Sequence, residues 1–489
     1  MRLIVLLMVI TACSAGVVAE SVSTEVSASS STTSTTSTTS ATVPAEPIPM
    51  TALRLIDPAT LEPITATLEI PGSPWDEPAV IPDGRLLFFS GNSPEPDQLW
   101  LSMVDFKRGV AESTEVDFSP SRILGYSEAT ERVVLMLTSG QGTRIVLVNP
   151  IDLSIVEGPI FEEQGNDWWP HEWALFDDGS KIAFYFTHGY DEKRLGEPPQ
   201  VRVLDLVTNI LGDPVSVDGV VHGLVELPEE FTRYPDFPFG EVEPGIVFDT
   251  VDGRLFAAHP DGKGLTVVDL VTNAVDTVYF ESQSSFWGRT LSWLIPPAEA
   301  KGNEPSVTIS AWLSPDRRFL YLTGESNDAW RDADKRLHTT TEPLGLMVVD
   351  TETLELKRNL ELPVSKGLST NTGVALTGTT SNQIWCDEEC KPGNDEPEVE
   401  GSGEATGLYI LDPDTLDIRE QLHPGVFFYY MDSFEDWIIS EDDIPEPWGY
   451  QSMDTRTGEM SPVRSTTGSS SLMVTEGGVI EIQWPDFDS

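Results

Sequence analysis

The chain has 489 residues, with 80 Asp and Glu against 29 Lys and Arg, so its formal net charge is −51. A surface this acidic repels phosphate, which excludes nucleic acid and anionic lipid headgroups as partners. Hydrophobic residues make up 39% of the chain, enough for a core, and one all-β domain can be this long. The acidity favours a solvated surface adapted to salt. A calcium-binding or other cation-binding protein is the alternative, although no cofactor is required by the sequence.

The N-terminus predicts export. Arg2 and the apolar run Leu3–Ile10 form a signal peptide within residues 1–20, too short to span a membrane permanently. Ile10-Thr11-Ala12-Cys13 resembles a bacterial lipobox, which would make Cys13 a lipidated residue and the only link to a membrane. Cleavage after Ala19, with secretion, is the alternative. The Ser/Thr-rich residues 21–50 read as a flexible stalk, and residues 51–489 as the folded domain.

Three cysteines are an odd number for an exported chain. With Cys13 lipidated, Cys386 and Cys390 remain, and an oxidising compartment favours a disulfide between them. A metal or redox site is the alternative, but the further ligands of a zinc site are absent nearby.

One phrase recurs through the domain: an apolar run, Asp or Asn, two variable residues, Thr or a substitute, and a second run. Its Asp or Asn can accept a hydrogen bond from the backbone two residues on, which is typical of a hairpin turn. The phrase occurs at Asp57, Asp105, Asn149, Asp205, Asp269, Asp350, Asp412 and Asp454.

A second phrase, a turn often containing Asp-Gly and then an apolar run, precedes most copies, as at Asp83-Gly84 and Asp178-Gly179. Ser314-Pro315-Asp316 opens its fullest copy, and together the phrases make four strands. The pattern resembles the YVTN-type, quinoprotein-like repeat family of bacterial surface proteins. That resemblance implies an all-β β-propeller of four-stranded antiparallel blades, and it says almost nothing about function.

Eight copies favour eight blades, with seven as the alternative. The first copy lacks two strands, and residues 471–482 supply two at the other end, so we expect the N- and C-terminal strands to pair. The repeat is interrupted by inserts near 216–244, 280–310, 325–345 and 386–406, which we interpret as functional or mobile loops.

No catalytic motif and no metal-ligand spacing occurs in the sequence. The loops at one end of the strands are instead rich in aromatic residues, which could stack on sugars or recognise peptides, or else pack between blades. The candidate ligand-binding residues are Trp75, Trp168, Trp169, His171, Trp287 and Trp330.

These observations favour a monomeric, cell-surface binding or display module for an extracellular protein or polysaccharide. The alternatives are a propeller enzyme, either a glycan-active hydrolase or lyase or a quinone-dependent dehydrogenase, and a structural surface-layer element.

Overall fold

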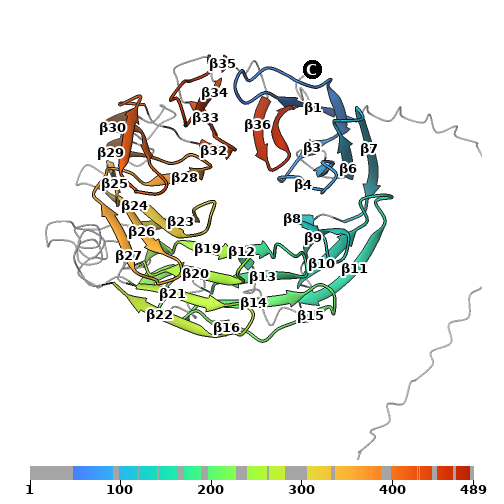
Figure 1. The fold of residues 1–489 in the computed structure, drawn as a ribbon, viewed down its shortest axis with the longest axis horizontal. Helices are drawn as coiled ribbons and strands as arrows, with labels where there is room; N and C mark the ends of the chain where they lie inside the picture. The colour runs from blue at the N-terminus through green and yellow to red at the C-terminus, as the bar shows by residue number, and fades with distance from the viewer. Residues whose placement is uncertain are drawn as a thin grey trace, which may run out of the picture. The chain divides into compact units, whose positions relative to one another are not determined.

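The computed structural model describes residues 48–484 except 92–97, 119, 140–141, 162–169, 189–195, 227–238, 261–263, 281–305, 332–335, 387–397, 427, 429, 443–448 and 466–469. These residues belong to the unit Ile48–Ser489, whose described strands pair antiparallel except for β18 (Phe239–Glu243) with β23 (Ser306–Leu313), which are parallel. No helix occurs among the described residues. In Figure 1 the sheets of this unit stand around a common axis in chain order, the organisation of a β-propeller.

Strands from both ends of the chain share the first sheet, in the order β2-β1-β37-β36, where β1 pairs with β37. We name each sheet after one of its central strands. The β1 sheet contains β1 (Met50–Ile56), β2 (Leu68–Pro71), β36 (Ser470–Thr475) and β37 (Gly478–Gln483). The β5 sheet contains β3 (Ser73–Pro74), β4 (Ala79–Val80), β5 (Leu86–Gly91), β6 (Leu99–Asp105) and β7 (Val110–Val116).

Three sheets follow. The β9 sheet contains β8 (Pro120–Ser127), β9 (Arg132–Ser139), β10 (Gly142–Val148) and β11 (Ile155–Phe161). The β13 sheet contains β12 (Pro170–Leu175), β13 (Lys181–Phe186), β14 (Gln200–Asp205), β15 (Ile210–Leu211) and β16 (Val215–Ser216). The β20 sheet contains β19 (Ile246–Asp249), β20 (Arg254–Ala258), β21 (Gly264–Asp269) and β22 (Val275–Tyr279).

The next sheet has eleven strands, and it contains two four-stranded meanders. The β24 meander consists of β23 (Ser306–Leu313), β24 (Phe319–Arg331), β26 (Leu346–Asp350) and β27 (Leu356–Leu360). The β29 meander consists of β28 (Lys366–Thr370), β29 (Gly373–Cys386), β30 (Glu398–Leu411) and β31 (Ile418–Leu422). The remaining strands are β17 (Gly223–Glu226), β18 (Phe239–Glu243) and β25 (Leu337–Pro343). The last sheet, the β33 sheet, contains β32 (Tyr430–Phe434), β33 (Trp437–Asp442), β34 (Gly449–Asp454) and β35 (Arg464–Ser465).

The core lies between neighbouring sheets. On β5, Leu86 and Phe88 pack toward the β1 sheet, whereas Leu87 and Phe89 pack toward the β9 sheet. Successive side chains of a strand point to opposite faces, so a strand buried on both faces is continuously apolar. This explains the unbroken apolar runs of the repeat. The described residues form further clusters of this kind between successive sheets, and one of them joins the β33 sheet to the β1 sheet.

The Asp-centred phrase forms the turn between the third and fourth strands. The Asp350 carboxylate accepts hydrogen bonds from the backbone N–H of Glu352 at 3.1 Å and of Thr353 at 2.8 Å. The fifth residue has a positive φ, and its N–H donates to the carbonyl of the first, as Leu354 does to Asp350 at 2.9 Å. The fifth positions of the eight turns are Leu61, Gly109, Leu153, Asn209, Asn273, Leu354, Leu416 and Gly458. The predicted Asp chemistry is therefore present, within a longer turn than a two-residue hairpin.

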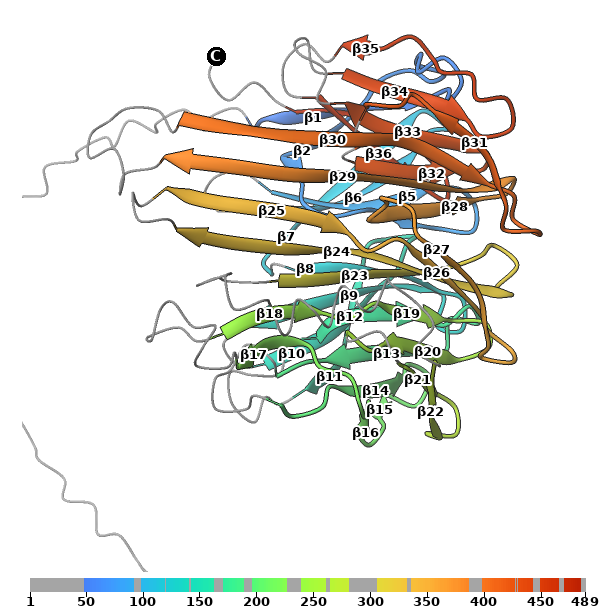
Figure 2. The ribbon, with the colours of Figure 1, turned by 90° about the vertical axis from the view of Figure 1, so that its left-hand side faces the viewer.

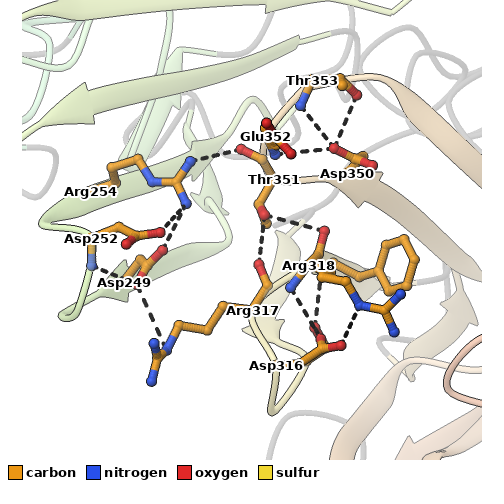
Figure 3. Close-up of polar contacts among 12 residues, drawn as sticks. Asp249, Asp252, Arg254, Asp316, Arg317, Arg318, Asp350, Thr351, Glu352 and Thr353 are labelled. Atoms are coloured by element: carbon orange, nitrogen blue, oxygen red, sulfur yellow. Dashed lines mark hydrogen bonds and ion pairs between the residues drawn. The ribbon is translucent and has the colours of Figure 1, made fainter.

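Arginines join adjacent sheets at these turns (Figure 3). Arg254 donates to the Thr351 carbonyl of the β24 meander at 2.8 Å and pairs with the fully buried Asp249 at 2.9 Å. Arg318 reaches the β29 meander through a side chain instead, since it donates to the Asp414 carboxylate at 2.7 Å. Arg254 is the first residue of β20 and Arg318 immediately precedes β24, so both contacts arise at the start of a second strand.

Candidate functional site

Two of the predicted inserts form strands that extend the fold beyond its sheets. β24 has 13 residues and β29 and β30 have 14 each, against 7 or 8 in the β9 sheet. In Figure 2 their far halves, with β25, project on the left-hand side. We call the strands on this side the collar: residues 223–226, 239–243, 324–331, 337–343, 377–386 and 398–406.

Strand pairing makes the collar continuous. β25 pairs with the far half of β24 and also with β29, from Leu337↔Trp385 to Thr341↔Ser381, which links the two meanders. On the other side β18 pairs in parallel with β23 through Glu241↔Ser306. The order β17-β18-β23-β24-β25-β29-β30 therefore runs unbroken.

A groove of about 770 Å³ lies at the foot of the collar, between β25, β29 and residues 361–363. Two cross-strand pairs line it, Thr340↔Asn382 and Thr380↔Glu404. Directly opposite residues of antiparallel strands project from the same face of a sheet. The pairs therefore form a small grid of hydroxyl, amide and carboxylate groups.

The groove is acidic as well as polar. Glu342 and Glu361 add two carboxylates to that of Glu404, and no Lys, Arg or His is among the lining residues. Such a surface can hydrogen-bond hydroxyl groups or hold a cation, whereas phosphate would be repelled.

A histidine pair lies beside the collar at the start of the innermost strand β12. The ring centroids of His171 and His222 are 4.2 Å apart, and His222 Nδ1 lies 3.3 Å from the Tyr185 hydroxyl. Burial, and then the neighbouring His171, lower the pKa of His222 to about 3, so its ring is neutral. Burial raises the pKa of Glu172 above its usual value. The neighbouring His171 opposes this shift, whereas Glu243 of the collar adds to it.

A second cavity, of about 650 Å³, lies among the inner strands and turns of four sheets. Its carboxylates are Glu77, Glu128, Asp177 and Glu476, again without a basic lining residue. Burial raises the pKa of Glu77, with further contributions from Asp432 and Asp76. Burial also raises the pKa of Asp432. The cavity thus holds a carboxyl group whose pKa lies above its usual value.

Two of the predicted ligand-binding residues can be located completely. Trp75 is 40% exposed and contacts Phe89 edge-on at 5.2 Å, so it packs against the β5 sheet while it leaves part of its ring open. His171 contacts His222, which is not among the candidate residues that the sequence indicates. Trp330 belongs to β24 and Cys386 to β29, but their side chains lie outside the described residues. Trp168, Trp169, Trp287, Cys13 and Cys390 lie outside them altogether.

The expectation that the inserts are loops is wrong for much of their length. Residues 325–331, 337–343 and 398–406 are strands, as are β17 and β18. The sequence signal was the run of β-branched threonines at 339–341, 377 and 379–380, which suits strands. It was missed because these strands carry polar rather than apolar residues.

The described part of the chain contains no cluster of three or more His, Cys, Asp or Glu arranged to hold a metal ion. Over the same residues, no helix has the length and apolar character needed to cross a membrane.

No protein-family model and no curated protein matches the chain. Distant likenesses occur among solved structures. Dihydro-heme d1 dehydrogenase NirN matches at 12% identity and a TM-score of 0.46, over 85% of this chain and 73% of its own. Oligogalacturonate lyase from Vibrio parahaemolyticus matches at 10% identity and a TM-score of 0.38, over 85% of this chain and 90% of its own. TolB from Acinetobacter baumannii matches at 11% identity and a TM-score of 0.28, over 81% of this chain and 80% of its own. Likenesses this distant decide nothing about activity.

Proposed function

We propose that this protein is an exported binding or display module that holds a polar polymer, either a polysaccharide or an extended protein segment, at its collar. The single observation that carries the proposal is the groove at the foot of the collar. There, two elongated hairpins are joined by β25–β29 pairing and offer Thr340, Asn382, Thr380 and Glu404 on one face. Long polar strands contribute little to the core, so binding is their best physical explanation.

The test uses one cross-strand pair of the groove. Glycan and peptide arrays probed with the full chain should reveal a ligand, and Thr380→Val with Glu404→Gln should weaken its binding about tenfold, through lost hydrogen bonds. Thr114→Val with Glu112→Gln on the exposed strand β7 is the matched control and should bind as the parent does. The proposal fails if the arrays capture nothing, or if both double variants bind alike.

We also propose that the ring has eight blades and is closed by the β1 sheet; seven blades would be the alternative. Support comes from the eight turns with a positive-φ fifth residue, and from the pairing of β1 with β37 from Ala52↔Gln483 to Ile56↔Val479. Packing of Ile439 and Tyr450 against Ile56 and Val479 supports the last contact of the ring. Closure leaves no exposed sheet edge between the first and last blades.

For the cellular location and processing of the protein, the proposal is the one that the sequence predicts. We propose a lipid anchor on Cys13, a stalk over residues 21–50, and a Cys386–Cys390 disulfide. Metabolic labelling with an alkyne fatty acid in a bacterial host should mark the parent chain but not Cys13→Ser. Equal labelling of both would contradict the anchor.

An enzyme is the second candidate, favoured by the raised pKa of Glu77 in the inner cavity. A carboxyl group with a raised pKa is suited to act as a general acid on a glycan. Turnover of an array-captured glycan that Glu77→Gln abolishes would establish this function, and unchanged turnover would exclude that role for Glu77.

A further inference from the structure

The eight Asp-centred turns provide an internal comparison, because their third residues have the same backbone role. The N–H of Ile151 donates to the Asn149 side chain at 3.0 Å, and that of Glu352 donates to Asp350 at 3.1 Å. The contact uses only the backbone of the third residue, so its side chain can vary from turn to turn without loss of the turn.

Three consecutive sheets place β-branched aliphatic residues at the third position. Ile151, Val207 and Val271 are 79%, 64% and 62% exposed. The third residues of the other five turns are Ala59, Lys107, Glu352, Asp414 and Arg456. Turn positions favour small or polar residues, so three exposed aliphatic residues have no local structural explanation.

The three sheets are neighbours, and each adds an apolar residue on its outermost strand. The β9, β13 and β20 sheets pack together through two shared core clusters. Val156, Ile210 and Val275 on these strands are 51%, 64% and 41% exposed. We call these six residues the apolar arc: Ile151, Val156, Val207, Ile210, Val271 and Val275.

Charge indicates what the apolar arc would bind. The turns and strands that carry it also contain the carboxylates of Asp152, Asp205, Asp213, Asp269 and Asp276. A second copy of the chain would bring the same carboxylates and the same net charge of −51, which opposes self-association. A partner rich in Lys and Arg would instead be attracted to these carboxylates.

We propose that the apolar arc is a docking surface for a protein segment that presents aliphatic side chains bordered by Lys or Arg. Large exposed apolar residues that gather on neighbouring elements beside polar residues are typical of protein interfaces, and these six lie on three neighbouring sheets. This surface belongs to different sheets from the groove of the collar, so the inference does not depend on the proposed function.

The test compares two variants of the full chain, each with three aliphatic residues replaced by threonine but at different positions. The arc variant carries Ile151→Thr, Val207→Thr and Val271→Thr, which preserve β-branching. The control variant carries Ile64→Thr, Val110→Thr and Ile418→Thr, at exposed aliphatic positions on other sheets. The probes are synthetic 14-residue peptides of alternating Leu/Lys, Ser/Lys and Leu/Glu, titrated by fluorescence anisotropy in 0.15 M and 0.5 M salt.

The Leu/Lys peptide should bind the parent and the control variant alike, about tenfold more weakly to the arc variant, and more tightly than either other peptide. Equal binding to all three proteins would mean general attraction to an acidic surface and would overturn the proposal, as would no binding to the parent. Sedimentation equilibrium that shows arc-dependent dimers would overturn it in favour of a second copy. Matching thermal melts of the two variants exclude misfolding as the cause.

Discussion

Leucine occupies a backbone conformation that usually favours glycine or asparagine in four of the eight turns, at Leu61, Leu153, Leu354 and Leu416. The conformation costs roughly 1–2 kcal/mol for a residue with a Cβ. Leu61 and Leu416 are buried in the clusters between sheets, where burial contributes about 1.5–3 kcal/mol. Packing between sheets therefore offsets the strain of the turn.

Leu416→Gly should remain destabilising although it relieves the strain. The lost burial and the cavity left behind outweigh the relief, so the free energy of unfolding should fall by about 1–3 kcal/mol. Asn273→Gly at the matching exposed turn position should change it by a few tenths of a kcal/mol. Urea denaturation checks both, and a stabilised Leu416→Gly would show that strain dominates.

His222 should make the fold sensitive to acid. The unfolded imidazole takes a proton near pH 6.5, whereas the folded one does so only at about 3. Unfolding thus takes up a proton between these values, and the free energy of unfolding falls as the pH drops, by up to about 1.4 kcal/mol per pH unit. His222→Gln should flatten the curve between pH 6.5 and 4 relative to the parent. Parallel curves from denaturation at each pH would refute this account.

At the scale of elements, the turns could be predicted from the sequence and the collar could not. Asp at a turn start acts through bonds to the next few residues, so Asp350 and its equivalents are visible as a local pattern. The pairing of β25 with β29 depends on residues about forty positions apart, and the contact of His171 with His222 on residues 51 apart. The threonine runs mark the strands of the collar, but neither of these two long-range contacts leaves a local signal.

We call the pairing of β1 with β37 the seam, and Glu481 of β37 lies on it. It pairs with Arg54 of β1 at 2.9 Å and with Arg464 of β35 at 2.7 Å, and Arg464 also donates to the Leu61 carbonyl. Glu481→Gln should lower the free energy of unfolding by about 1–3 kcal/mol, because it removes the charge that two partly exposed arginines share. Glu476→Gln, in the exposed turn of the same hairpin, should have almost no effect. Equal effects in guanidinium denaturation would mean that the seam does not depend on this ion triad.

At the scale of the whole molecule, a net charge of −51 sets the response to salt. Self-repulsion destabilises a compact acidic protein, and added ions screen it. The melting temperature should therefore rise between 0.01 M and 1 M NaCl. Most of the rise should occur below about 0.2 M, because most of the shortening of the screening length occurs there. Calorimetry that finds a fall, or no change, would show that local ion pairs such as Arg254–Asp249 outweigh the repulsion.

The most direct test of the central claim, that the collar is the binding face, is hydrogen–deuterium exchange with and without the glycan or peptide captured on the arrays. Slower exchange on ligand addition is expected in residues 337–343, 373–386 and 398–406, with no change in β7 or in the Asp-centred turns. Protection confined to the turns or the inner cavity, with the collar unchanged, would contradict the account.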